Sequence, residues 1–421
     1  MKHTLKMLMA AGTIAIAAGI MLIPIFATTV TETEPNDDTA HANTLRATQV
    51  MSAAIGTTGD TDYFAIDGIN TNWGVIALLD TSAVTGSQQG ELTMLSDDGT
   101  TILQSDVGSW EKGSGIALQS YANNDRNDHY LKVNESGDDQ TIPNYTLRFY
   151  ETYASTESET EPNDTPASGT PSAVTHEGVL STNTDVDCFR FSGHSGEEMI
   201  FALNGDPEND GSSANMALSL YKSDGSLLKT ANRSGIGGNE FIDYDSLPED
   251  GIYAYCVSVV GGSGGSTATY HVGLVKGNGQ LYMPSTSQKL TRLDPPADEW
   301  LLPGDTITVH AAITNTDIIT IPGGIKMSLR FTSATTPCLA MVQTDPPHTF
   351  LSSNVVQWDE ALKPELAPGE VYSVTATFEA LQPCTDYISY NPVLSYYDTS
   401  IGAGNSYYTI AHAIYLPLIM R

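Results

Sequence analysis

Thr31-Glu-Thr-Glu-Pro-Asn-Asp-Asp-Thr-Ala40 returns further along the chain as Ser158-Glu-Thr-Glu-Pro-Asn-Asp-Thr-Pro-Ala167. A second stretch, Gly59-Asp-Thr-Asp-Tyr-Phe64, returns as Thr184-Asp-Val-Asp-Cys-Phe189, and Tyr145 returns as Tyr270. The offsets stay between 125 and 127 residues over the whole span. A period of this length is too long for one unit of a solenoid. The chain therefore contains two copies of one domain, which we place at residues 31–153 and 158–277.

Within each copy, apolar and polar residues alternate in short runs. Phe64 and Ile66 alternate with small or polar neighbours in the first copy, and Phe189 and Phe191 do so in the second. The runs end at breaks rich in Gly, Asn and Asp. A period of two residues is typical of half-buried antiparallel strands. About eight such strands in a domain of this size form a β-sandwich, so we predict an all-β protein with two tandem sandwiches.

The last segment, residues 285–421, does not share the repeat. Ile307, Val309 and Ile313 alternate with their neighbours, and a further alternating run follows Pro368-Gly369. The turn signals are spaced as in immunoglobulin-like domains, so we predict a third β-sandwich of that kind. Short linkers near residues 154–160 and 277–287 predict an elongated arrangement of the three domains.

The chain is strongly acidic. Its 421 residues include 18 Lys and Arg against 50 Asp and Glu, a formal net charge of −32. Phosphate backbones would repel such a surface, so nucleic-acid binding is disfavoured.

Residues 1–27 have the pattern of a secretory signal peptide. Lys2 and Lys6 precede an apolar and weakly polar run from Met7 to Ala27. The alternative is an uncleaved membrane anchor, because the run is nearly long enough to span a bilayer. In either case we expect the rest of the chain to be extracellular or at the cell surface, with membrane contact only if the segment is uncleaved.

Four cysteines in an exported chain suggest two disulfides. Cys188 and Cys256 both leave the aromatic core on the outer side of their strands, because Phe189 and Tyr255 beside them point inward. We therefore predict a Cys188–Cys256 disulfide, which leaves Cys338 to pair with Cys384. The alternative is four free, buried thiols.

Each copy also carries a constellation of acidic residues. Four oxygen-bearing side chains crowd the first motif, and two aspartates spaced two apart point to one face at the start of a strand. Such carboxylates repel one another unless a cation lies between them. Ca²⁺ prefers six to eight hard oxygen ligands, so this arrangement predicts a calcium site. The alternative is a solvated acidic turn capped by Asn36 or Asp37. The candidate calcium ligands are Glu32, Glu34, Asn36, Asp37, Asp60 and Asp62 in the first copy, and Glu159, Glu161, Asn163, Asp164, Asp185 and Asp187 in the second.

Taken together, these repeated motifs resemble the bacterial pre-peptidase C-terminal (PPC) domain, a jelly-roll-like β-sandwich appended to secreted enzymes. The resemblance covers residues 31–150 and 158–276. Collagen-binding modules of clostridial collagenases look like relatives and carry calcium at the same motif, where the preceding linker enters the sandwich. The resemblance thus implies that calcium at Glu159 and Glu161 fixes the joint between the first two domains. This chain departs from the family in having Cys188 where an aromatic residue is usual, and in having no catalytic domain.

The third segment is similar to repeat modules of bacterial surface proteins. The matching residues are Gly304, Asp305, Ile307, Thr308, Val309, Asn315, Trp358, Pro368 and Gly369. This similarity also implies an immunoglobulin-like fold.

Two common catalytic motifs are absent from the sequence. None of the nine histidines belongs to a His-Glu-x-x-His motif, and no P-loop occurs. We therefore predict an exported, non-catalytic, calcium-binding protein that binds an extracellular polymer, matrix or surface protein in adhesion; no small-molecule substrate is inferred. The alternatives are an accessory module of a separately encoded secreted protease and an undetected secreted hydrolase.

Four tryptophans offer either a stacking surface for sugars or peptides or ordinary core positions: Trp73, Trp110, Trp300 and Trp358.

Overall fold

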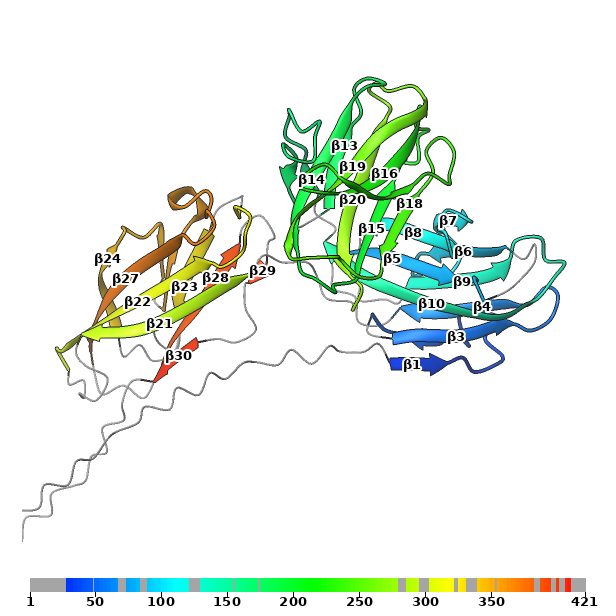
Figure 1. The fold of residues 1–421 in the computed structure, drawn as a ribbon. Coiled ribbons are helices and arrows are strands. Elements are labelled where there is room, and N and C mark those ends of the chain that lie inside the picture. The colour runs from blue at the N-terminus through cyan, green and yellow to red at the C-terminus, as the bar shows by residue number, and fades with distance from the viewer. Residues whose placement is uncertain are drawn as a thin grey trace, which may run out of the picture.

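A computed structural model gives the fold of the protein (Figure 1). It describes residues 28–47, 49–66, 73–83, 89–120, 129–153, 156–172, 175–278, 285–294, 303–321, 325–330, 339–352, 354–381, 387–394, 399–400 and 406–409. Over these ranges the chain is all-β, as predicted, with one short 3₁₀ helix, η1 (Glu360–Leu362). No helix in the described part is long and apolar enough to cross a membrane. The predicted signal peptide, residues 1–27, lies outside the described residues.

The first repeat forms two five-stranded sheets that face each other. One sheet has the order β1 (Thr28–Thr31), β3 (Gln49–Ile55), β10 (Ile142–Tyr153), β5 (Trp73–Asp80), β8 (Gly113–Ser120). The other has the order β2 (Asn43–Leu45), β4 (Thr61–Ile66), β9 (His129–Glu135), β6 (Gly90–Leu95), β7 (Ile102–Val107). Alternate residues of both sheets, among them Phe64, Leu92 and Phe149, fill the space between them.

The second repeat has the same strand order, strand for strand. Its first sheet runs β11 (Thr156–Ser158), β13 (Thr175–Val179), β20 (Thr269–Lys276), β15 (Met199–Asn204), β18 (Glu240–Tyr244). Its second runs β12 (Thr170–Pro171), β14 (Val186–Gly193), β19 (Gly251–Gly262), β16 (Ala214–Lys222), β17 (Leu227–Ala231). The core is aromatic, with Phe189, Phe191 and Phe201 packed against Tyr253 and Tyr255. The repeated sequence thus encodes one topology twice.

The predicted Cys188–Cys256 disulfide is confirmed. The two cysteines lie directly opposite each other in the antiparallel pair β14–β19. They pack with Ala254 on the side of the sheet away from the aromatic core, as the alternation predicted. The predicted Cys338–Cys384 pair lies outside the described residues.

The third segment forms two further sheets. One has the order β21 (Thr286–Asp294), β22 (Thr306–Asn315), β27 (Val371–Ala380), β24 (Leu339–Asp345). The other contains β25 (Phe350–Leu351), β26 (Val355–Trp358), β23 (Ile325–Arg330), β28 (Tyr387–Leu394), β29 (Thr399–Ser400) and β30 (Ser406–Thr409). Trp358 is buried between them and donates a hydrogen bond from Nε1 to the Pro346 carbonyl oxygen, 2.8 Å away. Trp358 is therefore a core residue and not part of a stacking surface.

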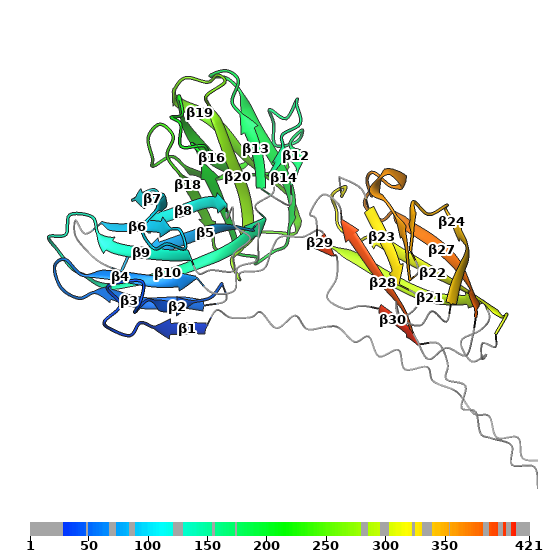
Figure 2. The same ribbon diagram turned by 180° about the vertical axis from the view of Figure 1, so that it is seen from behind.

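The first two repeats pack against each other through equivalent sheets, as both ribbon views show (Figures 1 and 2). The outer face of β5, β8 and β10 meets the outer face of β15, β18 and β20. Phe241 lies against Gly115, where an added Cβ would be only 2.5 Å from its ring. The buried apolar residues of this inter-repeat interface are Ile76, Leu78, Trp110, Ala117, Leu118, Tyr150, Ile200, Ala202, Phe241 and Val275. Trp110 is thus an interface residue, while Trp300 and the Trp73 side chain lie outside the described part.

Ion pairs reinforce this interface. Asp243 of the second repeat is 1% exposed and accepts from Arg148 (2.9 Å) and Lys112 (3.0 Å) of the first. The Arg148 guanidinium also lies over the rings of Trp110 and Tyr150. Side-chain packing and these charges therefore hold the joint between the first two repeats. The contribution of calcium at Glu159 and Glu161 to the same joint stays a prediction.

Replacing Asp243 should weaken this joint strongly. Asp243→Ala leaves the Arg148 and Lys112 charges without their shared partner, and breaking a buried pair in this way costs about 3 kcal/mol. We expect a clear fall in the denaturation midpoint of the full chain. Asp245→Ala is the matched control, because Asp245 is 85% exposed and 3.9 Å from Lys112. Equal midpoints for the two variants would contradict the role of the buried pair.

Candidate metal centres

Each acidic motif crosses from one sheet of its sandwich to the other. In the first repeat the motif leaves β1 and leads to β2, while Asp60 and Asp62 stand at the start of β4 in the second sheet. The backbone N–H of Tyr63 donates to the Asn36 carbonyl oxygen at 3.0 Å. The second repeat has the same bond, from Cys188 to Asn163, at 3.1 Å. Because this bond fixes the motif beside the aspartates, each sandwich gathers its acidic residues at one end.

In the first repeat the structure brings all five predicted carboxylates together. Oxygen atoms of Glu32, Glu34 and Asp62 lie within 4.8 Å of one another, and so do those of Glu34, Asp37 and Asp60. Glu34 belongs to both groups and joins them. Asp62 is fully buried, whereas Glu34 and Asp37 are exposed. The cluster therefore runs from the edge of the core to the surface and is able to hold a metal ion.

In the second repeat the cluster is smaller. Glu161, Asp185 and Asp187 lie within 4.8 Å of one another. The Glu159 carboxylate is held by the Val179 backbone N–H (3.0 Å) and the Tyr270 hydroxyl (3.0 Å). Asp164, the remaining predicted carboxylate, is exposed and does not belong to this group. The two repeats thus share the centre of the predicted site and differ at its rim.

The predicted asparagines sit at the centre of both clusters. Asn36 and Asn163 are fully buried. Turned with its nitrogen inward, the Asn36 amide donates to Glu34 at 3.0 Å and to Asp62 at 3.1 Å. The Asn163 amide, turned in the same way, donates to Glu161 at 3.2 Å and to Asp187 at 3.3 Å. Turned with its oxygen inward, either amide supplies one more oxygen ligand to a cation shared with these carboxylates.

Burial and nearby carboxylates raise the pKa of the buried aspartate in each cluster, Asp62 or Asp187. Burial raises the pKa of Asp62 to about 8, and the nearby charges of Glu32 and Asp60 act in the same direction. Burial and a hydrogen bond with Glu159 raise the pKa of Asp187 to about 9. A bound cation would remove this penalty, because it favours the ionised form of every carboxylate around it.

Sequence analysis assigned no role to Tyr145 and Tyr270, although they recur at the repeat offset. Tyr145 donates its hydroxyl hydrogen to Asp62. Tyr270 donates to Asp187 at 2.7 Å. Each tyrosine belongs to the opposite sheet from its aspartate. The two tyrosines orient the buried carboxylates. The sequence signal that could have revealed this role is their separation of 125 residues, which equals the offset of the repeat.

No protein-family model matches the sequence, and no curated protein matches it either. Among solved structures, parts of the chain are similar to a β-glucuronidase from Bacteroides uniformis, at 11% identity over 53% of this chain and 26% of that chain (TM-score 0.19). A GH2 β-galacturonidase from Eisenbergiella tayi gives 12% identity over 49% and 32% (TM-score 0.14). Red sea bream transglutaminase gives 12% over 51% and 27% (TM-score 0.16). The chain spans a third or less of each, and scores this low carry no argument about function.

In the absence of a metal ion, we expect the protein to become less stable as the pH rises. The raised pKa values of Asp62 and Asp187 mean that, between about pH 4 and pH 8, the folded chain retains protons that the unfolded chain releases. Stability then falls as pH rises through this window. Melting curves in excess chelator should show this fall, and an Asp62→Asn, Asp187→Asn double variant should flatten it.

The control for this experiment is Asp38→Asn with Asp224→Asn. Both aspartates are exposed, one in each repeat, and hydrogen bonds lower their pKa values. This double variant should keep the slope of the original protein. An unchanged slope in the Asp62→Asn, Asp187→Asn variant would show that the buried aspartates do not control the pH dependence.

Proposed function

We propose that the protein is an exported, non-catalytic, calcium-binding protein that binds an extracellular polymer, matrix or surface protein. The observation that carries the proposal is the duplicated oxygen-only cluster at the end of each sandwich. Its carboxylates and amide are hard ligands suited to Ca²⁺. Zn²⁺ sites usually include His or Cys, and Mg²⁺ is seldom held by a crowded all-protein cage. The first ion would be held by Glu32, Glu34, Asp37, Asp60 and Asp62, and the second by Glu161, Asp185 and Asp187, each with its buried asparagine.

The type of β-sandwich in each domain is also part of the proposal. The first two sandwiches would be jelly-roll-like PPC domains, and the third an immunoglobulin-like module. The common strand order of the repeats and the position of the acidic motif support the first assignment. The paired sheets around Trp358 support the second. The disulfide between Cys188 and Cys256 fits an extracellular or cell-surface location, where oxidising conditions preserve such bonds.

Calcium should stabilise both repeats. Extracellular modules bind Ca²⁺ with dissociation constants of about 10⁻⁴–10⁻³ M. A tenfold excess over such a constant stabilises the folded chain by about 1.4 kcal/mol per site. We therefore expect a higher melting temperature in millimolar calcium than in chelator, with Asp62→Ala and Asp187→Ala each removing one site's share. Asp38→Ala and Asp224→Ala should keep the full shift. Superimposable curves with and without calcium would refute the metal assignment.

The binding function is tested separately. Pull-down of the full chain on collagen, chitin, cellulose and peptidoglycan, in calcium and in chelator, should show retention on one of them. Retention only in the presence of a co-expressed secreted protease would indicate the accessory-module alternative. Turnover of casein or glycan substrates by the purified chain would instead identify a hydrolase.

A further inference from the structure

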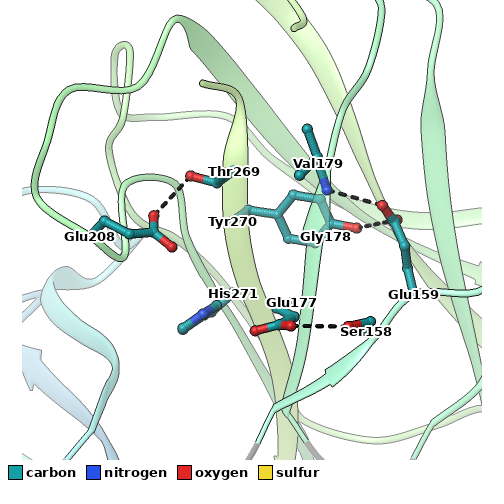
Figure 3. A pocket seen from close by; sticks show the side chains of 9 residues that line it. All are labelled: Ser158, Glu159, Glu177, Gly178, Val179, Glu208, Thr269, Tyr270 and His271. Carbon is teal, nitrogen blue, oxygen red and sulfur yellow. Dashed lines mark hydrogen bonds between the residues drawn. The ribbon is translucent and has the colours of Figure 1, made fainter. Parts of the chain in front are cut away.

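A pocket on the second repeat contains none of the ligands proposed for the second ion, Glu161, Asp185 and Asp187. Glu159 and Tyr270, which lie beside that site, line one edge of the pocket. It is a cavity of about 330 Å³ on the outer face of the sheet that contains β11, β13 and β20 (Figure 3). This volume is at the lower end of the range for small-ligand sites. Its polar lining includes Ser158, Glu177, Glu208, Thr269 and His271. No lysine or arginine occurs among the described residues that line it.

The strand register builds the floor of this pocket. Ser158 on β11 lies opposite Glu177 on β13, and Glu177 lies opposite His271 on β20. Residues paired in this way point to the same face and are neighbours. Glu208 reaches the pocket from the loop between β15 and β16, where the Thr269 hydroxyl donates to it at 2.9 Å. Figure 3 shows Glu177 bonded to Ser158 near His271, and Glu208 bonded to Thr269 at another part of the pocket.

The pocket has a negative charge held in place. The hydroxyls of Thr156 (2.7 Å) and Ser158 (3.0 Å) donate to the two oxygens of Glu177. These hydrogen bonds lower the pKa of Glu177, so the carboxylate stays ionised. Burial lowers the pKa of His271, which keeps its ring neutral near pH 7. The charges of Glu177 and Glu208 are therefore not neutralised within the pocket.

The first repeat shows that the fold does not require these groups. There, Ser52 on β3 lies opposite Thr146 on β10, in the register positions of Glu177 and His271. The same strands thus form the same sheet with small neutral residues. Both repeats carry an acidic metal cluster, but the first repeat has neither of these two pocket residues. Glu177 and His271 are therefore specific to the second repeat, and the fold alone does not explain them.

We propose that this pocket binds the guanidinium group of an arginine side chain. The ligand atoms of Glu177, Glu208 and His271 do not converge within 4.8 Å of one another, unlike those of the metal clusters, so the pocket suits a cation larger than a bare metal ion. A guanidinium presents several N–H donors in a planar fork and binds carboxylates in pairs. The arginine belongs either to a polypeptide partner or to a free small molecule. This inference does not depend on calcium.

The test is titration of the full chain, in calcium, with N-acetyl-arginine-N-methylamide, followed by calorimetry. The neutral citrulline analogue is the matched ligand, because it keeps the shape and loses the charge. We expect saturable binding of the arginine compound and at least tenfold weaker binding of the citrulline compound. An arginine-containing peptide that binds more tightly than the small analogue would identify a polypeptide source, and equal binding would identify a small molecule.

Protein variants complete the test. Glu177→Gln with Glu208→Gln keeps the size of both side chains and their capacity to accept hydrogen bonds, and it should weaken arginine binding at least tenfold. Glu365→Gln removes an exposed charge in the third segment and should leave binding unchanged. Absence of saturable binding, equal binding of the citrulline analogue, or full binding by the double variant would each overturn the proposal. The citrulline comparison uses the unaltered protein, so the result does not depend on how the variants fold.

Discussion

In each of the first two sandwiches, a hydrogen bond joins the two sheets beside the acidic cluster proposed to bind calcium. A tyrosine on the central strand of one sheet, Tyr145 or Tyr270, donates to a buried aspartate on the other sheet, Asp62 or Asp187. The acidic motif crosses between the sheets at the same end. A cation held there would contact ligands from both sheets. Its binding would therefore stabilise the packing of one sheet against the other. Without a cation, the same crowding opposes folding.

The inter-repeat interface changes how the first two domains act together. Arg148 and Lys112 share one buried aspartate, and an apolar patch from both sheets surrounds them. A joint of this kind limits the relative motion that a short flexible linker would otherwise allow. The pocket beside His271 lies on the same outer sheet face as this patch, because His271, Gly273 and Val275 alternate along β20. Its position relative to the first repeat is therefore fixed by the joint.

The sequence predicted those features that depend on local periodicity. Alternation around Phe189 and Tyr255 placed Cys188 and Cys256 on one outer face, and they proved to be register partners. Crowded oxygen-bearing side chains, repeated in both copies, pointed to the acidic clusters. The sequence did not reveal the interface, because Ile76 and Leu78 look like ordinary strand residues whether they face a core or another domain. It also did not distinguish Asp164 from Asp37: the two have the same position in the motif, but only Asp37 lies in a carboxylate group, with Glu34 and Asp60.

The contact between Gly115 and Phe241 shows that the two copies have diverged to fit each other. The positions are equivalent, since Gly115 pairs with Leu78 and Phe241 pairs with Ala202 on corresponding strands. The first repeat has Leu78 beside Gly115, a large residue beside a glycine. The second repeat has Ala202 beside Phe241, a small residue beside a large one. Two copies of the first type would leave a gap at this point, and two of the second would clash. At this joint the two copies are therefore not interchangeable, because each supplies the side-chain size that the other lacks.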